Sequence, residues 1–377
     1  MTDTFDVVIV GAGISGISAA YRIRKRNPGI SYVILERRAN IGGTWDLFRY
    51  PGIRSDSSIF TLSFPWEPWT RREGIADGDH IREYMTDTAR KHGIYEHIHF
   101  DSYVRSADWD SETDTWTVHA DDGTTYQARF VFFATGYYNY DEGYTPDFPG
   151  IDNFKGDVVH PQHWPEDLDY TGKTMVVIGS GATAVTLVPS LSERAGKVIM
   201  LQRTPSYVGT FPRTDSMTEG LRKVLPGRLF HAVARFRMAL QEAIAWFLAR
   251  KTPAFMKYLF RRMQTKRLPE GYDIDTHFSP PYQPWDQRIC LAADGDLFDA
   301  IDAGRVEVVT DHIDHFDASG IALTSGRHLD ADIVVTATGL QLQALGGVAL
   351  SLDGAEVKPQ DRFVYKAHML QDVPNLF

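Results

Sequence analysis

Two copies of one local pattern constrain the fold of this chain more than any other feature of its sequence. Each copy reads as a short β-branched strand, a glycine-rich turn, a helix with apolar spacing and a second strand. The first copy occupies residues 5–36 and the second occupies residues 174–203. Strands that alternate with helices in this way are typical of a parallel sheet. We therefore predict an α/β fold that contains two units of the same kind.

The first turn has the spacing Gly-x-Gly-x-x-Gly, and Glu36 follows at the end of the next strand. The glycines permit a tight turn, a close approach of the backbone to a pyrophosphate, and close packing of the helix on the strand. The acid can accept hydrogen bonds from ribose hydroxyls. This combination predicts a Rossmann-like domain that binds FAD. The candidate residues are Gly11, Gly13, Ser15, Gly16, Glu36, Gly43, Thr44, Trp45, Arg54, Asp56 and Val104.

The second turn, Gly179–Ala184, leads to a strand that ends in Arg203 instead of an acid. A carboxylate there would repel a 2′-phosphate, whereas a guanidinium pairs with it through two hydrogen bonds. The alternative is an exposed arginine at a strand end. We predict a second Rossmann-like domain that binds NADPH. Its candidate residues are Gly179, Gly181, Ala182, Thr183, Ala184, Arg203 and Thr204.

Composition excludes several classes of protein. The net charge of −10 argues against nucleic-acid binding. A single cysteine, Cys290, excludes an intramolecular disulfide and a Cys-x-x-Cys redox pair, and fits a reducing, cytoplasmic setting. We predict no metal site, no signal peptide and no transmembrane helix.

Residues 217–267 are helical in pattern and strongly basic. Twelve Lys and Arg residues against Glu219 and Glu242 give this segment a charge of +10, which leaves −20 for the rest of the chain. The plainer interpretation is an inserted helical subdomain with a solvated basic face. The alternative is a surface that contacts anionic lipid headgroups and makes the protein membrane-associated.

The stretch from Phe154 to Pro165 lies between the two glycine-rich units. Pro161 and Pro165 interrupt both helical and strand patterns there. Its aromatic and imidazole side chains make it a candidate coupling element between two nucleotide sites, or alternatively a buried packing linker.

This stretch also carries a family resemblance. Phe154, Gly156, His160 and Trp164, followed by Pro165, match the fingerprint of type I Baeyer–Villiger monooxygenases, which are class B flavoprotein monooxygenases. Residues 42–56, 137–143 and 160–170 are similar to the mycobacterial ethionamide-activating subgroup. The resemblance covers essentially the whole chain.

The resemblance implies a reaction and two catalytic residues. NADPH reduces FAD, and O2 forms a C4a-(hydro)peroxyflavin that inserts one oxygen atom into a ketone, giving an ester or lactone, or transfers it to sulfur. The implied substrate is a small apolar ketone or thioether. The family's catalytic arginine corresponds to Arg288, and the aspartate that positions it corresponds to Asp56. Gln287 departs from the lysine that is commoner in the family.

The expected domain plan follows from these assignments. Two Ala-Thr-Gly strand ends, at Gly136 and Gly339, predict that the chain leaves the first domain and returns to it. The expected segments are 1–145 (FAD domain), 146–170 (linker), 171–213 (NADPH domain), 214–285 (helical insertion), 286–338 (NADPH domain) and 339–377 (return to the FAD domain).

The apolar end of the sequence leads us to expect a fragment or a truncated gene product. This expectation keeps two alternatives to a coupled monooxygenase open. One is an uncoupled NADPH oxidase, and the other is a non-catalytic nucleotide-binding fragment.

Overall fold

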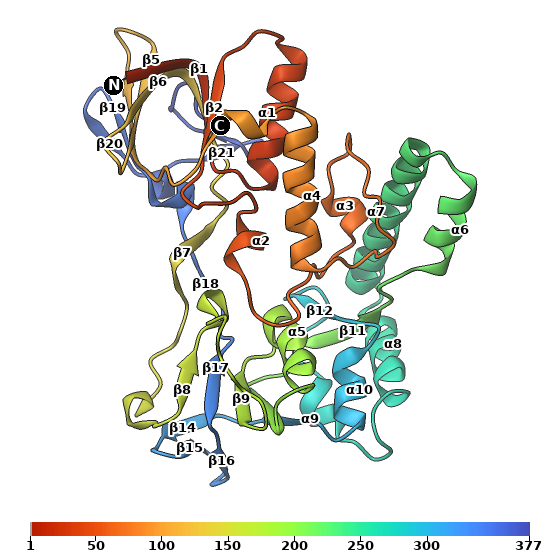
Figure 1. Cartoon of the computed structure of the whole chain (residues 1–377). Coiled ribbons are helices and arrows are strands. Elements are labelled where there is room, and N and C mark those ends of the chain that lie inside the picture. The colour runs from red at the N-terminus through yellow and green to blue at the C-terminus, as the bar shows by residue number, and fades with distance from the viewer. Residues whose placement is uncertain (1) are drawn as a thin grey trace. The chain divides into compact units, whose positions relative to one another are not determined.

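The computed structural model describes residues 2–377, and it divides into two compact units (Figure 1). Unit 1 contains the chain up to Leu47, Asp79–Gly143 and Leu340–Phe377. Unit 2 contains Phe48–Gly78 and Tyr144–Gly339. Each unit holds one of the two glycine-rich turns, and the α/β class predicted from the sequence is confirmed.

Unit 1 is built on an eight-stranded sheet with the order β20-β19-β4-β5-β6-β1-β2-β3. The strands β6, β1, β2 and β3 run parallel, and β4, β5 and β6 form an antiparallel meander. The strands are β1 (Thr2–Val10), β2 (Tyr32–Leu35), β3 (Ile98–His99), β4 (Val104–Asp110), β5 (Thr115–Ala120), β6 (Thr125–Phe133), β19 (Ala349–Leu352) and β20 (Ala355–Val357). The helices are α1 (Ile14–Arg26), α2 (Thr44–Leu47) and α4 (Gly78–Lys91).

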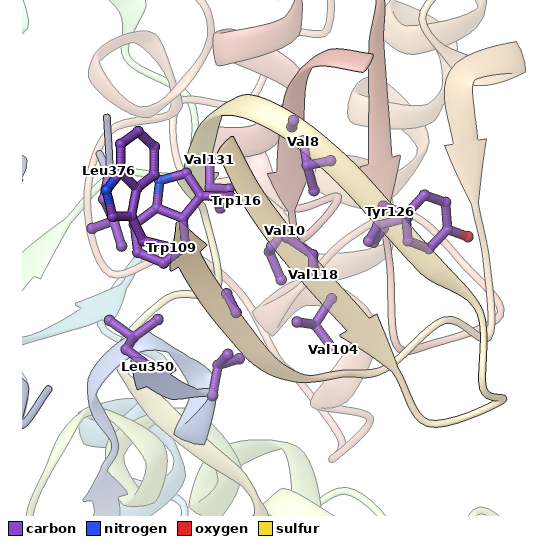
Figure 2. Packing of buried hydrophobic residues seen from close by; sticks show 14 of the residues in the cluster. Val8, Val10, Val104, Trp109, Trp116, Val118, Tyr126, Val131, Leu350 and Leu376 are labelled. Carbon is purple, nitrogen blue, oxygen red and sulfur yellow. The ribbon is translucent and has the colours of Figure 1, made fainter. Parts of the chain in front are cut away.

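A tryptophan pair lies in the core of this sheet (Figure 2). The rings of Trp109 and Trp116 are 5.6 Å apart and tilted, and both side chains are buried. Trp116 donates a hydrogen bond to the Pro374 carbonyl at 3.0 Å. Leu376 packs in the same cluster, so the last residues of the sequence belong to the core of unit 1.

Unit 2 is built on a five-stranded parallel sheet with the order β13-β10-β9-β17-β8. These strands are β8 (Asp157–Val159), β9 (Thr174–Ile178), β10 (Lys197–Gln202), β13 (Val306–Thr310) and β17 (Ile333–Thr336). A separate parallel pair is formed by β11 (Tyr207–Phe211) and β12 (Ile289–Ala293). A small antiparallel sheet contains β14 (Ile313–Phe316), β15 (Gly320–Leu323) and β16 (His328–Asp330). The helices near the main sheet are α5 (Ala182–Leu191), α9 (Ile274–Phe278) and α10 (Asp296–Asp302).

The basic segment forms three helices of unit 2, α6 (Ser216–Val224), α7 (Gly227–Lys251) and α8 (Pro253–Thr265). Helix α7 packs on α3 (Ile59–Leu62). Arg235 donates hydrogen bonds to the carbonyl groups of Phe60 and Ser63 at 3.0 and 2.8 Å. These two carbonyls lie at the end of α3, where no next turn of helix donates N–H groups to them. Among the described residues, no helix is both long enough and apolar enough to span a bilayer.

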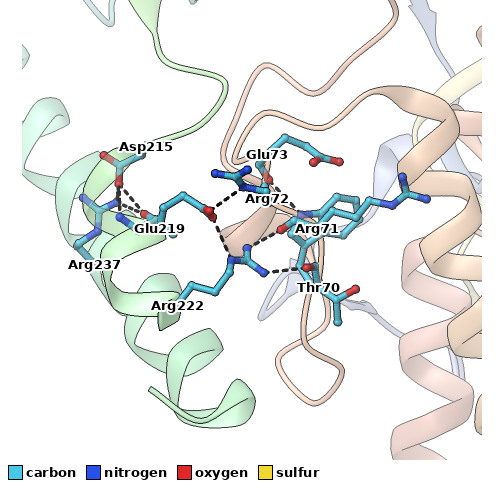
Figure 3. A network of polar contacts seen from close by, with 10 residues as sticks. Thr70, Arg71, Arg72, Glu73, Asp215, Glu219, Arg222 and Arg237 are labelled. Atoms are coloured by element: carbon cyan, nitrogen blue, oxygen red, sulfur yellow. Dashed lines mark hydrogen bonds and ion pairs between the residues drawn. The ribbon is translucent and has the colours of Figure 1, made fainter. Parts of the chain in front are cut away.

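A polar network joins α6 to the loop before residue 74 (Figure 3). Arg222 donates hydrogen bonds to the carbonyls of Thr70, at 2.7 Å, and Arg71. Glu219 pairs with Arg222 at 3.0 Å and with Arg72 at 2.8 Å. The network therefore uses basic residues of the insertion for internal contacts.

Three features differ from the sequence expectations. Residues 48–78, which we placed in the FAD domain, belong to unit 2, because Gly74 donates to the Arg213 carbonyl at 2.6 Å and Arg54 pairs with Asp296. The chain passes from unit 1 to unit 2 after Gly143, not at Gly136. The 146–170 segment, which we expected to be a linker, contains β8, which pairs with β17 as an edge strand of the unit 2 sheet.

Candidate dinucleotide sites

The glycine-rich turn of unit 1 packs against the first of the two Ala-Thr-Gly strand ends noted in the sequence. Gly11 has a φ of +107°, and a Cβ at this position would lie 2.6 Å from the Ala134 carbonyl oxygen. Ala134 begins the first Ala-Thr-Gly strand end. Gly16 is equally restricted, since its Cβ would lie 1.9 Å from the Gly11 carbonyl oxygen. Both positions therefore require glycine for steric reasons.

The N-terminus of α1 is left uncapped at this turn. Gly13 is the N-cap residue, and no side chain accepts a hydrogen bond from the first turn of the helix. Free N–H groups at a helix N-terminus suit an anionic phosphate. A cavity at this end of the sheet is lined by eight of the predicted residues, and these are Gly11, Gly13, Ser15, Glu36, Gly43, Thr44, Trp45 and Val104.

Glu36 is held in place at the wall of this cavity. One carboxylate oxygen accepts the Ala12 N–H at 2.7 Å, and the other accepts the Arg38 N–H at 3.0 Å. The side chain is 4% exposed, and burial raises its pKa, although the two hydrogen bonds act in the opposite direction. Each oxygen has a second lone pair for a ribose hydroxyl.

The turn of unit 2 repeats this construction. Gly179 has a φ of +145°, and a Cβ would lie 2.4 Å from the carbonyl oxygen of Ala337, in the second Ala-Thr-Gly strand end. Gly181 is the N-cap of α5, again with no side-chain cap. The two Ala-Thr-Gly segments thus serve the same purpose, which is to close a phosphate-binding turn.

A cavity of about 610 Å³ opens at this second turn. Its volume lies within the roughly 300–1,000 Å³ typical of ligand pockets. Arg203 and Thr204 line it from the end of β10, and Gln287 and Arg288 line it from the segment before β12. These side chains supply positive charge and hydrogen-bond donors beside the glycine turn, a donor set that fits a phosphorylated nucleotide.

Arg288 and Asp56 lie in the same electrostatic neighbourhood. Both side chains are exposed, and the charges of both influence the pKa of the buried Cys290 thiol. Burial raises the pKa of that thiol to about 12, Arg288 acts to lower it and Asp56 acts to raise it. A Cβ on Gly181 would lie 3.4 Å from an Arg288 Nη atom, so the guanidinium faces the glycine turn.

Six predicted cofactor residues line neither cavity, and these are Gly16, Arg54, Asp56, Ala182, Thr183 and Ala184. The Arg54 side chain is 6% exposed and pairs with Asp296 at 2.5 Å, which makes it a structural ion pair within unit 2. Thr183 bonds to the buried Tyr50 hydroxyl, and burial raises the Tyr50 pKa to about 12. Ala184 is fully buried in α5.

The fingerprint residues lie within unit 2. Phe154 and Trp164 are buried, and a Cβ on Gly156 would lie 2.2 Å from the Asp332 carbonyl oxygen. The Nδ1 atom of His160 accepts the Gln162 N–H at 3.2 Å, and its Nε2 bonds to the Gly339 carbonyl at 3.2 Å. Burial lowers the His160 pKa.

Sequence reasoning missed several residues of these sites. Tyr140 and Tyr103 line the first cavity, and Ser180 and Ser206 line the second. Tyr140 comes from β7 (Tyr138–Gly143), a strand that its aromatic composition indicates. No local pattern marks Ser206, which precedes β11 and reaches the turn only through the fold.

A family profile matches more than half of the chain. The profile is described as pyridine nucleotide-disulphide oxidoreductase, and it matches residues 8–210. The chain has one cysteine, and that thiol is buried, so it lacks the dithiol pair to which this name refers.

A curated relative and two solved structures refine the assignment. The FAD-containing monooxygenase EthA of Mycolicibacterium smegmatis is 53% identical over 100% of this chain and 77% of its own length. A steroid monooxygenase bound to NADP matches with a TM-score of 0.74 and 27% identity, over 92% of this chain and 73% of that one. An open structure of cyclohexanone monooxygenase matches with a TM-score of 0.76 over 94% of this chain and 78% of that one, and at 22% identity it shows the fold alone. The chain therefore belongs to the pyridine nucleotide-disulphide oxidoreductase family and to the FAD-containing monooxygenases that its fingerprint residues predicted.

Proposed function

We propose that this protein is an FAD- and NADPH-dependent monooxygenase that transfers one oxygen atom from O2 to a small apolar ketone or to a sulfur centre. One observation carries the proposal: the two uncapped glycine turns are followed by different residues, Glu36 in unit 1 and Arg203 in unit 2. An acid accepts ribose hydroxyls, and a guanidinium binds a 2′-phosphate. When bound, NADPH would supply hydride and the flavin would carry the oxygen atom.

The protein's own residues have separate roles in this proposal. Arg203 and Thr204 bind the adenosine phosphate in the second cavity. Arg288 presents a fixed cation that stabilises negative charge as it develops on oxygen. Asp56 lies in the same electrostatic neighbourhood and positions that guanidinium.

An Arg288→Ala variant tests the catalytic assignment. We expect the variant to oxidise NADPH but to lose oxygenated product by about 100-fold or more, because a preorganised charge of this kind contributes that much. Product from a ketone and from a thioether is measured beside hydrogen peroxide. Arg305→Ala, which removes an exposed arginine outside the cavity lining, is the matched control.

Product formation at the wild-type rate in Arg288→Ala would remove Arg288 from the mechanism. Stoichiometric peroxide without product in the unaltered protein would favour the uncoupled oxidase. Uptake of added FAD is measured by the flavin absorption spectrum. No uptake would favour a non-catalytic nucleotide-binding protein.

We further propose that α7 contacts an anionic lipid surface. Five of its exposed apolar residues recur every three, four or seven positions and therefore share one face of the helix. These residues are Leu229, Phe236, Leu240, Ile244 and Phe247, and each is 47–70% exposed. The buried residues Phe230, Ala234 and Met238 lie on another face. An exposed apolar face of this length marks an interaction site.

The charges around this face favour lipid over a second copy of the chain. Glu242 is the only acid in α7, and it bonds to the Thr61 hydroxyl. Arg228 and Lys251 lie near the two ends of the helix. Antiparallel packing of two copies would bring these like charges together, whereas anionic headgroups attract them at about 1 kcal/mol each.

Vesicle sedimentation tests this contact. We expect binding to phosphatidylserine-containing vesicles and not to phosphatidylcholine vesicles, with a decrease as salt rises. Phe236→Ser combined with Phe247→Ser should abolish binding, and Phe363→Ser, which alters an 82% exposed phenylalanine of unit 1, should not. Equal binding by all variants, or a dimer that the double variant dissociates, would overturn the lipid proposal.

A further inference from the structure

The two glycine turns are tied to their neighbouring strand ends in different ways. In unit 1, the second residue of the turn is Ala12, and its N–H donates to the Glu36 carboxylate at 2.7 Å. The acid at the end of β2 is thereby fixed to the phosphate-binding turn. This bond needs an acceptor at the strand end.

In unit 2 the strand ends in Arg203, which has donors only and cannot accept an N–H bond. The second residue of this turn is Ser180, and its hydroxyl supplies a different bond. Ser180 Oγ donates to the Thr204 carbonyl at 3.1 Å. Ser206 Oγ lies 3.0 Å from Ser180 Oγ, so Ser206 can donate to the lone pair that remains on Ser180.

We propose that Ser180 is a positioning residue that sets the preference for NADPH over NADH. Its side chain fixes the Arg203–Thr204 segment against the glycine turn, and so fixes the distance between the pyrophosphate site and the 2′-phosphate site. The inference rests on the proposed function, because it assumes that Arg203 binds the 2′-phosphate.

The backbone of Ser180 makes a further hydrogen bond. Its carbonyl accepts the Cys290 thiol, with Sγ at 3.7 Å. Cys290 lies on β12 two residues after Arg288, and β12 pairs with β11, which follows Ser206. One residue of the turn therefore touches both arginine-bearing segments of the cavity. The bonds to Thr204 and Ser206 use the side chain and the bond to Cys290 uses the backbone, so removal of the hydroxyl affects the 203–206 segment and leaves the bond to Cys290 in place.

Isothermal titration with NADP⁺ and with NAD⁺ tests the inference on the full chain. We expect Ser180→Ala to weaken NADP⁺ binding by about three- to tenfold, the effect of one hydrogen bond, and to change NAD⁺ binding by less than about twofold. Ser180→Thr keeps the hydroxyl and should restore NADP⁺ affinity. Ser190→Ala removes a hydroxyl that bonds within α5, to the Thr186 carbonyl, and should change neither affinity.

Equal losses for both nucleotides in Ser180→Ala, or no loss for either, would overturn the inference. Arg203→Ala separates this failure from failure of the proposed function. If Arg203→Ala discriminates between NADP⁺ and NAD⁺ while Ser180→Ala does not, only the role of Ser180 is wrong. If Arg203→Ala does not discriminate either, the phosphate role of Arg203 itself fails.

Discussion

Cys290 carries the single thiol of the chain, and its surroundings keep that thiol protonated. It lies on β12, is fully buried and has a pKa raised to about 12 by burial. The nearby guanidinium of Arg288 only partly opposes this effect. The thiol is therefore a packing group in the wall behind the second cavity, and not a nucleophile.

We expect the native protein to resist alkylation at Cys290. At pH 8 the thiolate fraction is negligible if the pKa is about 12, and iodoacetamide reacts with the thiolate. Mass spectrometry should show no label on the native chain after a time that labels the urea-unfolded chain fully. Labelling of the native protein at the rate of a free thiol would contradict the burial of this residue.

At the residue scale, local patterns predicted the turns well. Gly11, Gly179 and Glu36 occupy the positions that their spacing required, because a tight turn and an adjacent strand end are set by a few consecutive residues. Arg54 was less accessible to this reasoning. Its partner Asp296 lies 242 positions away, and only the folded chain brings the two together.

At the scale of elements, specific hydrogen-bond donors hold the helical insertion against the rest of unit 2. Of its twelve basic residues, six make hydrogen bonds or ion pairs within unit 2, and these are Arg222, Arg235, Arg237, Arg250, Arg261 and Arg267. The sequence indicated the charge and the helices correctly. It could not show which arginines cap carbonyls of another segment, because those carbonyls carry no sequence signal.

We expect Arg235→Ala to destabilise the protein by about 1–3 kcal/mol, because it leaves the Phe60 and Ser63 carbonyls without their donor. The free energy of unfolding is measured by urea titration. Arg228→Ala, at an exposed position of the same helix, is the control and should change it by less than about 0.5 kcal/mol. Equal effects of the two substitutions would contradict a capping role.

Strand β8, in the 146–170 segment, shows why sequence analysis misses a short element. Pro161 and Pro165 predicted a break in both helical and strand patterns, but the structure has a short 3₁₀ helix at Pro161–His163 and, before it, the three-residue strand β8. So short a strand has no measurable periodicity. It forms because β17 offers an unpaired edge, which is a property of the assembled sheet.

At the scale of the whole molecule, one buried and two partly buried histidines link stability to pH. Burial lowers the pKa values of His160, His231 and His277 below 6.5. These histidines therefore bind protons more readily in the unfolded chain than in the folded chain. Their contribution to stability is complete above about pH 6.5 and is lost as the pH falls through the lowered pKa values of the folded state.

We expect the free energy of unfolding to decrease as the pH falls from about 6.5 to 5.5, by up to about 1.4 kcal/mol per pH unit for each histidine. His231→Gln should make this decrease shallower, since it removes one titrating group. His315→Gln, which alters an exposed histidine, should leave the slope unchanged. Identical slopes for the wild type and His231→Gln would contradict the assignment.

The interleaved course of the chain has a consequence for its synthesis on the ribosome. Unit 2 is complete once Gly339 has been made, whereas β19, β20 and the strand-like pairing of Leu376 with Val131 all come later. At about 5–20 residues per second, the last 38 residues take roughly 2–8 s to appear. Until β19 has been made, β4 has an open edge in the nascent sheet, the kind of edge that chaperones and neighbouring chains bind. The unit whose sequence begins first is thus the last to close.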